Sequence, residues 1–200
     1  MNLPDQIKKF VDKFSKLPSI GPRQATRLAF YIINEGKNEI AETVEALEGL
    51  EKMSVCKNCF FVFSGDGEIC DICADNKRNP KIIALVEKET DLISLEKTGK
   101  FNGKYFIIGS LSKRGMLNAE QKNRLKKLRT YIEKELGGKA EEIIIAMNQT
   151  TYGDFNTALL AKEIETHTQK ITRLGRGIPT GGEIEFADEE TLGSALERRI

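Results

Sequence analysis

The chain has 200 residues, enough for one large domain or several smaller ones. Its 31 Lys and Arg residues nearly balance its 30 Asp and Glu residues, which gives a formal net charge of +1. Overall charge therefore points to neither a nucleic-acid nor a membrane partner, and any such site must come from local clustering. No segment has the apolar pattern of a secretion signal or a membrane span, so we expect a cytoplasmic protein with no membrane partner.

Three amphipathic helices are predicted in the first 53 residues, which we interpret as one domain. Apolar residues recur there at helical spacing. The three ranges are Asp5–Lys16, Arg23–Asn34 and Asn38–Met53. Between the first two lies LPSIGP, where Pro18, Gly21 and Pro22 interrupt helical structure. The sequence therefore predicts a tight hairpin between two short helices.

Arg23 and Arg27 follow this hairpin and are four residues apart, so both project from one face of the second helix. A glycine-containing hairpin that leads into a helix N-terminus also exposes unpaired backbone N–H groups that suit a phosphate. Together these groups could hold a nucleic-acid backbone without reading its bases. The alternative is a pair of solvated arginines beside a packing turn, and the spacing leaves both interpretations open.

The four cysteines form two CxxC pairs, Cys56 with Cys59 and Cys70 with Cys73, separated by ten residues. A tetrahedral zinc ion needs four ligands at about 2.3 Å, and two paired turns supply them. The intervening FFVFSGDGEI has turn residues at its centre, as a small hairpin would. Buried or redox-active cysteines are the alternative. We interpret residues 54–78 as a finger with one structural zinc ion, and expect that ion to stabilise the N-terminal half.

Strands and helices alternate after Pro80, which predicts a parallel sheet covered on both faces over residues 79–174. The strands are KIIALV, KYFIIG and EEIIIAM, at Lys81–Val86, Lys104–Gly109 and Glu141–Met147. The helices are Leu92–Lys97, Asn118–Leu136 and Asp154–Glu165. Residues 175–200 then predict a Gly-rich turn, a strand at Gly182–Phe186 and a helix at Asp188–Arg199.

Taken together, these segments resemble the RecR recombination-mediator family. LPSIGPRQATRLAF is similar to its helix-hairpin-helix, and the CxxC pairs are similar to its zinc finger. VEKETDLISLEKTGKFNGKYFIIG resembles the opening of its Toprim domain, and RLGRGIPTGGEIEFADEETLGSALERR resembles its C-terminal segment. The resemblance implies a multi-domain protein of mixed α+β and α/β class, with an N-terminal helix-hairpin-helix, a four-cysteine zinc finger, a Toprim-like domain and a C-terminal strand-helix segment that contacts other copies.

The function that this resemblance implies is non-enzymatic recombinational DNA repair in the bacterial nucleoid. Members of the family bind single- and double-stranded DNA without sequence specificity and act with RecO and RecF to help load RecA at gaps. They assemble as ring-like homo-oligomers, here a dimer or a tetramer. Carried onto this chain, Arg23 and Arg27 contact DNA, the four cysteines bind zinc, and Glu87 is the acidic residue after the first Toprim strand.

The chain departs from the family pattern in several loops. Ser19 stands where the family usually has glycine, Phe106 where histidine is common, and Tyr152 where an acidic residue is usual. The resemblance would place a RecO-facing acidic surface near the last of these. RecO contact is thus less firmly implied than DNA contact.

Toprim enzymes hold magnesium with a glutamate and an Asp-x-Asp pair. Glu87, Asp91 and Asp154 are present here, but no Asp-x-Asp follows the EIIIAM strand. We interpret the three carboxylates as a partner surface or a weak magnesium contact, and assign no catalytic residue. The alternatives are a magnesium-dependent Toprim nuclease or primase-like enzyme, and an assembly factor that binds only proteins.

Two further basic segments are of interest. Seven basic residues and one acidic residue, Glu120, lie between Lys113 and Arg129, which suggests either a DNA path or the solvated face of a helix. We expect TRLGRGIPTGG to turn the chain sharply between two strands, with Arg173 and Arg176 flanking a contact. The segment lacks the Gly-Lys-Ser/Thr ending of a nucleotide-binding loop.

Overall fold

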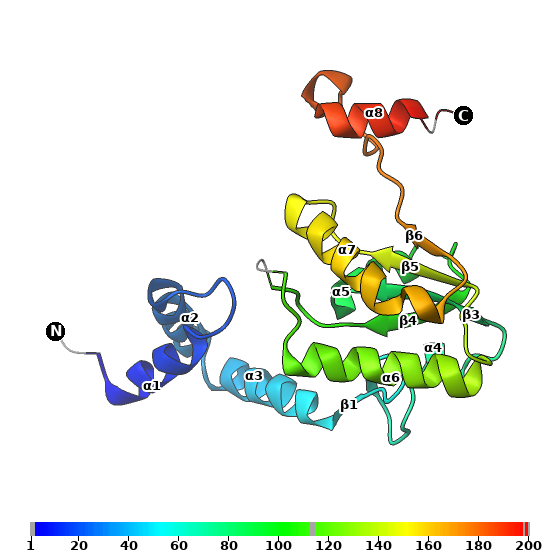
Figure 1. Cartoon of the computed structure of the whole chain (residues 1–200). Coiled ribbons are helices and arrows are strands. Elements are labelled where there is room, and N and C mark those ends of the chain that lie inside the picture. The colour runs from blue at the N-terminus through cyan, green and yellow to red at the C-terminus, as the bar shows by residue number, and fades with distance from the viewer. Residues whose placement is uncertain (1–2, 113–114, 198, 200) are drawn as a thin grey trace. The chain divides into compact units, whose positions relative to one another are not determined.

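The computed structural model in Figure 1 describes residues 3–112, 115–197 and 199. The chain divides into two compact units, Met1–Met53 and Ser54–Ile200. The four-cysteine segment therefore belongs to the second unit, together with the parallel sheet. The finer boundaries suggested by the sequence, after residues 78 and 174, remain predictions.

The first unit consists of three helices and a short 3₁₀ turn. They are α1 (Asp5–Phe14), α2 (Pro22–Glu35), α3 (Lys37–Gly49) and η1 (Leu50–Lys52). Helix α2 packs against both α1 and α3, and its small residues Ala25 and Ala29 are buried and allow close approach. Pro22 occupies the first turn of α2, where its missing N–H costs nothing. The three predicted helices are confirmed, although the third ends before η1.

The cysteine-containing segment opens the second unit. It contains a two-stranded sheet of β1 (Met53–Val55) and β2 (Val62–Ser64), followed by the short helix α4 (Asp71–Ala74). The first CxxC pair lies between the two strands, and the second begins just before α4.

A four-stranded parallel sheet forms the centre of the second unit, in the order β4-β3-β5-β6. Its strands are β3 (Asn79–Val86), β4 (Gly103–Ile107), β5 (Glu142–Ala146) and β6 (Ile171–Arg173). The connecting helices are α5 (Glu89–Glu96), α6 (Ala119–Glu135) and α7 (Thr151–Ile164), with η2 (Glu165–His167) after α7. The predicted parallel α/β arrangement is confirmed.

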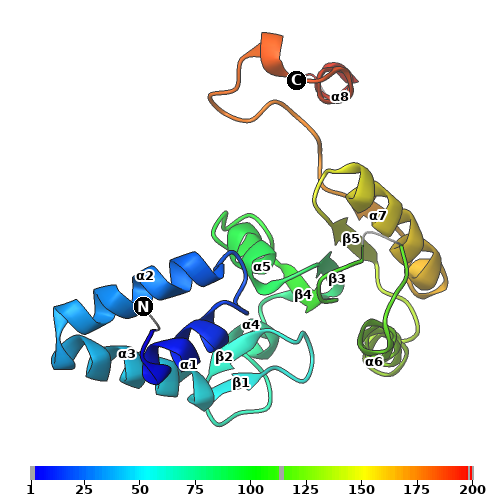
Figure 2. The ribbon, with the colours of Figure 1, turned by 90° about the vertical axis from the view of Figure 1, so that its left-hand side faces the viewer.

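Helices cover both faces of this sheet, as Figure 2 shows, with α5 on one side and α6 and α7 on the other. Alternate residues of β3 point to opposite faces. Ile83 and Leu85 pack with Leu128 of α6 and Leu160 of α7, whereas Val86 belongs to a second cluster with Leu92 of α5. The carboxyl ends of β3 and β5 thus meet at one edge of the sheet, the usual place for a site in such folds.

The C-terminal segment differs from the sequence prediction. The expected strand at Gly182–Phe186 is instead a 3₁₀ turn, η3 (Ile184–Phe186), followed by the helix α8 (Glu189–Glu197). Ile184 and Phe186 are 70% and 80% exposed. A strand needs a partner edge, and within the described residues none pairs with this segment. Arg173 is the last residue of β6, and Arg176 follows it outside any helix or strand, so the expected sharp turn between two strands is not found there.

In the described part of the chain, no helix is both long enough and apolar enough to cross a membrane.

Candidate nucleic-acid interface and metal centre

Arg23 and Arg27 lie in the first two turns of α2, and both are exposed. Ala25, which is buried, is two residues from each of them, or about 200° around the helix. The two guanidinium groups therefore lie on the side of α2 opposite its packed face. Within the described residues, no ion pair joins either of them to a carboxylate. The described part of the first unit thus leaves this pair of cations without a neutralising partner.

The hairpin before α2 turns at Ser19, which has a φ of 63°. The Ile20 N–H donates to the Leu17 carbonyl at 3.2 Å, and the Ala25 N–H donates to the Gly21 carbonyl at 2.9 Å. A left-handed φ favours glycine and costs other residues energy. Ser19 thus has a backbone conformation that favours glycine, and it stands where the family that the sequence resembles usually has glycine.

The four cysteine sulfur atoms converge in the second unit, and all lie within 4.8 Å of one another. Four sulfurs at about 2.3 Å from a tetrahedral zinc ion are about 3.8 Å apart, so the cluster fits that ion. Cys56, Cys59 and Cys70 are buried, and Cys73 is half-buried. A set of four thiols with no water position is typical of a structural site.

Hydrogen bonding within the cluster shifts the pKa values of two of its thiols in opposite directions. The contact between the Cys59 and Cys70 Sγ atoms is 3.5 Å. It raises the pKa of Cys59 and lowers the pKa of Cys70, and burial adds to the rise at Cys59. Several buried thiolates cannot coexist without a cation, so binding of zinc must release protons from this cluster.

The cysteine cluster is attached to the parallel sheet. The Ile107 N–H of β4 donates to the Cys59 carbonyl at 2.9 Å. Phe60 packs edge-on against Phe106 with ring centroids 5.3 Å apart, and the Arg124 guanidinium lies 4.6 Å from the Phe60 ring centroid. These contacts join the cysteine cluster to the sheet of the second unit, and stabilisation of the N-terminal half by zinc stays a prediction.

Lys104 of β4 makes a contact that sequence reasoning missed. Its ammonium donates to the carbonyls of Ile72 and Cys73 at 3.0 Å and of Asp75 at 2.7 Å. These carbonyls lie at the C-terminal end of α4, where a cation is favourable. Lys104 thus fixes the backbone that carries the second CxxC pair. No sequence motif marks it, because the contact joins residues about thirty positions apart.

Glu87 lies at the carboxyl end of β3 in a pocket of about 280 Å³. Its carboxylate accepts the Leu111 N–H at 3.0 Å and the Asn148 side-chain amide at 3.5 Å. Gly153 of α7 is required here, because an added Cβ would lie 1.7 Å from the Asn148 carbonyl oxygen. Of the described residues that line this pocket, only Glu87 carries a carboxylate, and Asn148 follows β5 where a Toprim enzyme would have its Asp-x-Asp.

Asp91 and Asp154 lie in settings different from that of Glu87. Asp91 caps the N-terminus of α5 by accepting the Lys88 N–H at 3.2 Å. Asp154 is paired with Arg173 and Arg176. Among the described residues, the cysteines are the one group of three or more His, Cys, Asp or Glu side chains close enough to hold a metal. The structure therefore does not bring the three carboxylates together.

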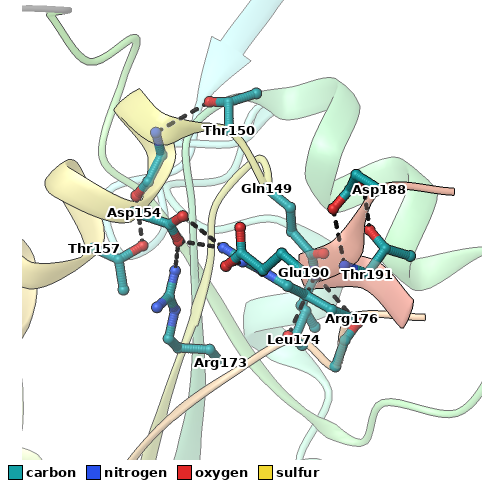
Figure 3. Close-up of polar contacts among 12 residues, drawn as sticks. Gln149, Thr150, Asp154, Thr157, Arg173, Leu174, Arg176, Asp188, Glu190 and Thr191 are labelled. Atoms are coloured by element: carbon teal, nitrogen blue, oxygen red, sulfur yellow. Dashed lines mark hydrogen bonds and ion pairs between the residues drawn. The ribbon is translucent and has the colours of Figure 1, made fainter. Parts of the chain in front are cut away.

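The Asp154 ion pairs connect α7 to the chain that leaves the sheet (Figure 3). The Arg176 guanidinium reaches both carboxylate oxygens of Asp154 at 2.6 Å and also pairs with Glu190 of α8. Arg176 and then Arg173 hold the pKa of Asp154 below its usual range. The Gln149 side chain donates to the Gly175 carbonyl at 3.1 Å. Asp154 thus anchors the start of the C-terminal segment.

Comparison with known families gives three matches along the chain. Residues 7–50 match the family described as RecR, helix-hairpin-helix, residues 81–175 match the Toprim domain, and residues 177–200 match RecR, C-terminal.

Whole proteins named Recombination protein RecR are also similar. One from Thermus thermophilus is 37% identical over 200 residues, which cover 100% of this chain and 98% of that protein. The protein of Herpetosiphon aurantiacus is 35% identical over 198 residues, covering 98% and 94%. The protein of Gloeobacter violaceus is 34% identical over 194 residues, covering 96% of each.

Proposed function

Because this chain belongs to the RecR family of recombination proteins, we propose that it is a non-enzymatic DNA-binding mediator of recombinational repair. In this proposal it binds single- and double-stranded DNA in the bacterial nucleoid without reading sequence. It acts with RecO and RecF to help load RecA at gaps. The observation that carries the proposal is the exposed pair Arg23 and Arg27 on the unpacked side of α2.

These two arginines would bind DNA through its phosphates. Guanidinium groups make charge-assisted bonds to phosphate oxygens, and such contacts position a protein on DNA without specifying bases. Two contacts alone are weak at physiological salt. Several copies around one duplex would add their contacts through effective concentration, which is the physical reason for a ring-like clamp.

Exposed apolar surface within each unit supports homo-oligomerisation as a dimer or tetramer. The first unit has an apolar groove of about 300 Å³. Val44 and Leu47 line it and are 47% and 49% exposed. In the C-terminal segment, Ile184 and Phe186 are more exposed still. Apolar surfaces of this kind mark protein contacts more often than free surface.

Zinc in this proposal is structural. Cys56, Cys59, Cys70 and Cys73 would hold the ion, which would supply four metal–sulfur bonds that close the finger. Their attachment to β4 through Cys59 keeps the finger on the sheet.

The direct test is the Arg23→Ala, Arg27→Ala double variant, with affinity measured on short fluorescent single- and double-stranded DNA. We expect affinity for duplex DNA to fall at least about tenfold near 0.1 M salt, and the slope of log K against log salt to fall by about 1.8 for each copy in contact with the duplex. Helix content and oligomer mass should not change, because both side chains are exposed.

A matched control is Lys9→Ala with Lys13→Ala. These exposed lysines have the same four-residue spacing on α1, and in the described residues neither forms an ion pair. The control should keep nearly full affinity. If the arginine variant bound DNA as well as this control does, α2 would not be the DNA contact.

The alternative function is a magnesium-dependent Toprim nuclease or primase-like enzyme, which the Toprim match of residues 81–175 favours. Against it, the Glu87 pocket offers a single carboxylate from the described residues that line it, and magnesium sites use several oxygen ligands. Nicking or extension of labelled DNA with magnesium, lost in Glu87→Ala, would establish the enzyme. No DNA binding even at low salt would instead favour a factor that contacts only proteins.

A further inference from the structure

A second cationic surface lies in the second unit, where the finger meets α6. It is a groove of about 720 Å³ between the first CxxC pair and the part of α6 from Asn123 to Glu135. Its charged lining residues are Lys57, Lys126, Lys127, Lys134 and Glu135. Four ammonium groups therefore share the groove with one carboxylate, in a chain whose overall charge is almost balanced.

The helical wall of the groove is a regular stripe. Asn123, Lys126, Lys127, Thr130 and Lys134 recur at helical spacing and share one face of α6. The stripe is about 16 Å long at 1.5 Å per residue. Stacked nucleotides rise about 3.4 Å per step along one strand, so the stripe can follow a run of about five phosphates.

Two of the three acidic residues of α6 are paired with residues outside the groove, and the third, Glu135, lies in its lining. Glu120 pairs with Arg124 at 2.6 Å, and Glu133 contacts His167 at 3.3 Å. Lys57 pairs with Glu68, which partly neutralises the positive charge that Lys57 brings to the groove. Lys126 and Lys134 are exposed, and in the described parts of the chain neither forms an ion pair. The helix thus presents two unneutralised lysines to the groove.

Phe60 holds the two walls of the groove together. Its ring packs against Phe106 of the sheet and lies 5.1 Å from the Lys127 ammonium of α6. Phe60 directly follows Cys59, so the metal site, the aromatic contact and the lysine stripe form one connected unit. The lysines therefore project from a helix that is packed against the finger, and not from a loop.

We propose that this groove is a second contact for the phosphate backbone of nucleic acid. The proposal rests on the proposed function for the identity of its ligand as DNA. Ammonium groups, together with the Asn123 amide and the Thr130 hydroxyl, are donors that suit phosphate oxygens. An acidic polypeptide would also meet the charge, but a protein partner usually buries apolar anchors, and lysines and polar side chains predominate here. The basic segment found in the sequence is thus divided: Lys126 and Lys127 line the groove, and Lys113 and Arg114 lie outside the described residues.

The test is the zinc-loaded, full-length Lys126→Ala, Lys134→Ala variant, measured by anisotropy with a fluorescent duplex. We expect affinity to fall at least about fivefold near 0.1 M salt, and the salt slope to fall by about 1.8 for each copy in contact with the duplex. The control is Lys97→Ala with Lys100→Ala, which removes two exposed lysines elsewhere in the same unit. Affinity equal to that of the control would overturn the proposal.

Two further measurements separate the possible outcomes. In the unmodified protein, bound duplex should protect Lys126 and Lys134, but not Lys97, from acetylation. Lack of protection would overturn the proposal even if the variant bound weakly. Loss of polyglutamate binding with unchanged DNA affinity would show an acidic-polypeptide site instead. If the arginine variant of α2 retains affinity and the lysine variant loses it, the assignment of α2 fails while the groove stands; the reverse result rejects the groove alone.

Discussion

Ser19 shows how one residue can carry strain in an otherwise regular hairpin. Its φ of 63° lies in the left-handed region, which costs a residue with a Cβ about 1 kcal/mol or more. The side chain is exposed, and within the described residues its hydroxyl makes no hydrogen bond that would offset that cost. Glycine would adopt the same turn without the steric penalty.

We therefore expect Ser19→Gly to stabilise the first unit by up to about 1 kcal/mol, measured by chemical denaturation. Ser15→Gly is the matched control, because Ser15 has a φ of −67° at the end of α1. There, glycine should destabilise by a few tenths of a kcal/mol or more through the entropy of the unfolded chain. Equal effects at the two positions would show that φ does not decide the outcome.

Two other single residues show what the sequence could not reveal. Lys104 secures α4 through three carbonyls, and Asn148 faces Glu87 in the pocket at the end of β3 and β5. Neither belongs to a sequence motif. Each lies on or next to a strand of the parallel sheet, and the pairing of the strands brings it close to residues that are distant in sequence. In contrast, the spacing of the cysteines alone predicted their convergence, which the structure confirms.

At the scale of elements, α7 and the C-terminal segment are joined by charge more than by apolar packing. Asp154 pairs with Arg173 and Arg176, and Arg176 also pairs with Glu190 of α8. The side chains of Ile184 and Phe186 remain exposed beyond this anchor. The segment is thus held at its start and presents its apolar residues to solvent.

Asp154→Asn should weaken the attachment of the C-terminal segment to α7. A partly exposed ion pair contributes up to about 1 kcal/mol, so limited proteolysis between Arg176 and Glu183 should become up to about fivefold faster. The arginines lower the pKa of Asp154 in the folded protein. Its stabilising effect is therefore fully present above the unfolded carboxyl pKa of about 3.9, and is lost as pH falls through the lower folded value.

Glu189→Gln, an exposed change in the same segment, is the control for that experiment. It should leave the cleavage rate unaltered from neutral pH down to acid. A rate in Asp154→Asn that matched this control at neutral pH would show that the ion pairs do not hold the segment.

At the scale of the whole molecule, the proposed function depends on several copies acting together. Each copy offers one arginine pair in the first unit and one lysine groove in the second. Contacts of this kind multiply only when one assembly presents them to the same DNA. The apolar groove lined by Val44 and Leu47 is the surface on which that assembly is expected to depend.

Val44→Glu with Leu47→Glu should shift the protein to smaller species, because burying two carboxylates in an apolar contact is costly. Sedimentation mass, taken with and without DNA across a salt series, measures the shift, and DNA affinity should fall with it. Ala41→Glu with Ala46→Glu adds the same two charges to exposed positions of α3 that do not line the groove. If both variants kept the parent mass, the groove would not be an oligomer contact.

Local patterns in the sequence determined much of this protein. Apolar periodicity predicted the helices of the first unit, the alternation of strands and helices predicted the parallel sheet, and paired CxxC spacing predicted the metal cluster. Each of these depends on residues near one another in the chain, so short-range chemistry is sufficient.

Only the tertiary structure decided what these parts contact. The GEIEF segment has strand-like composition but lacks a partner edge in the described chain, so it forms a 3₁₀ turn. The sequence suggested that Asp154 belongs to an acidic site, yet Arg173 at the end of β6 and Arg176 just after it neutralise its carboxylate. The lysine stripe of α6 forms one wall of a groove because the finger, whose Phe60 contacts Lys127, lies beside it and forms the other wall. Edge pairing, charge neutralisation and groove formation all join residues distant in sequence, and therefore depend on the folded arrangement.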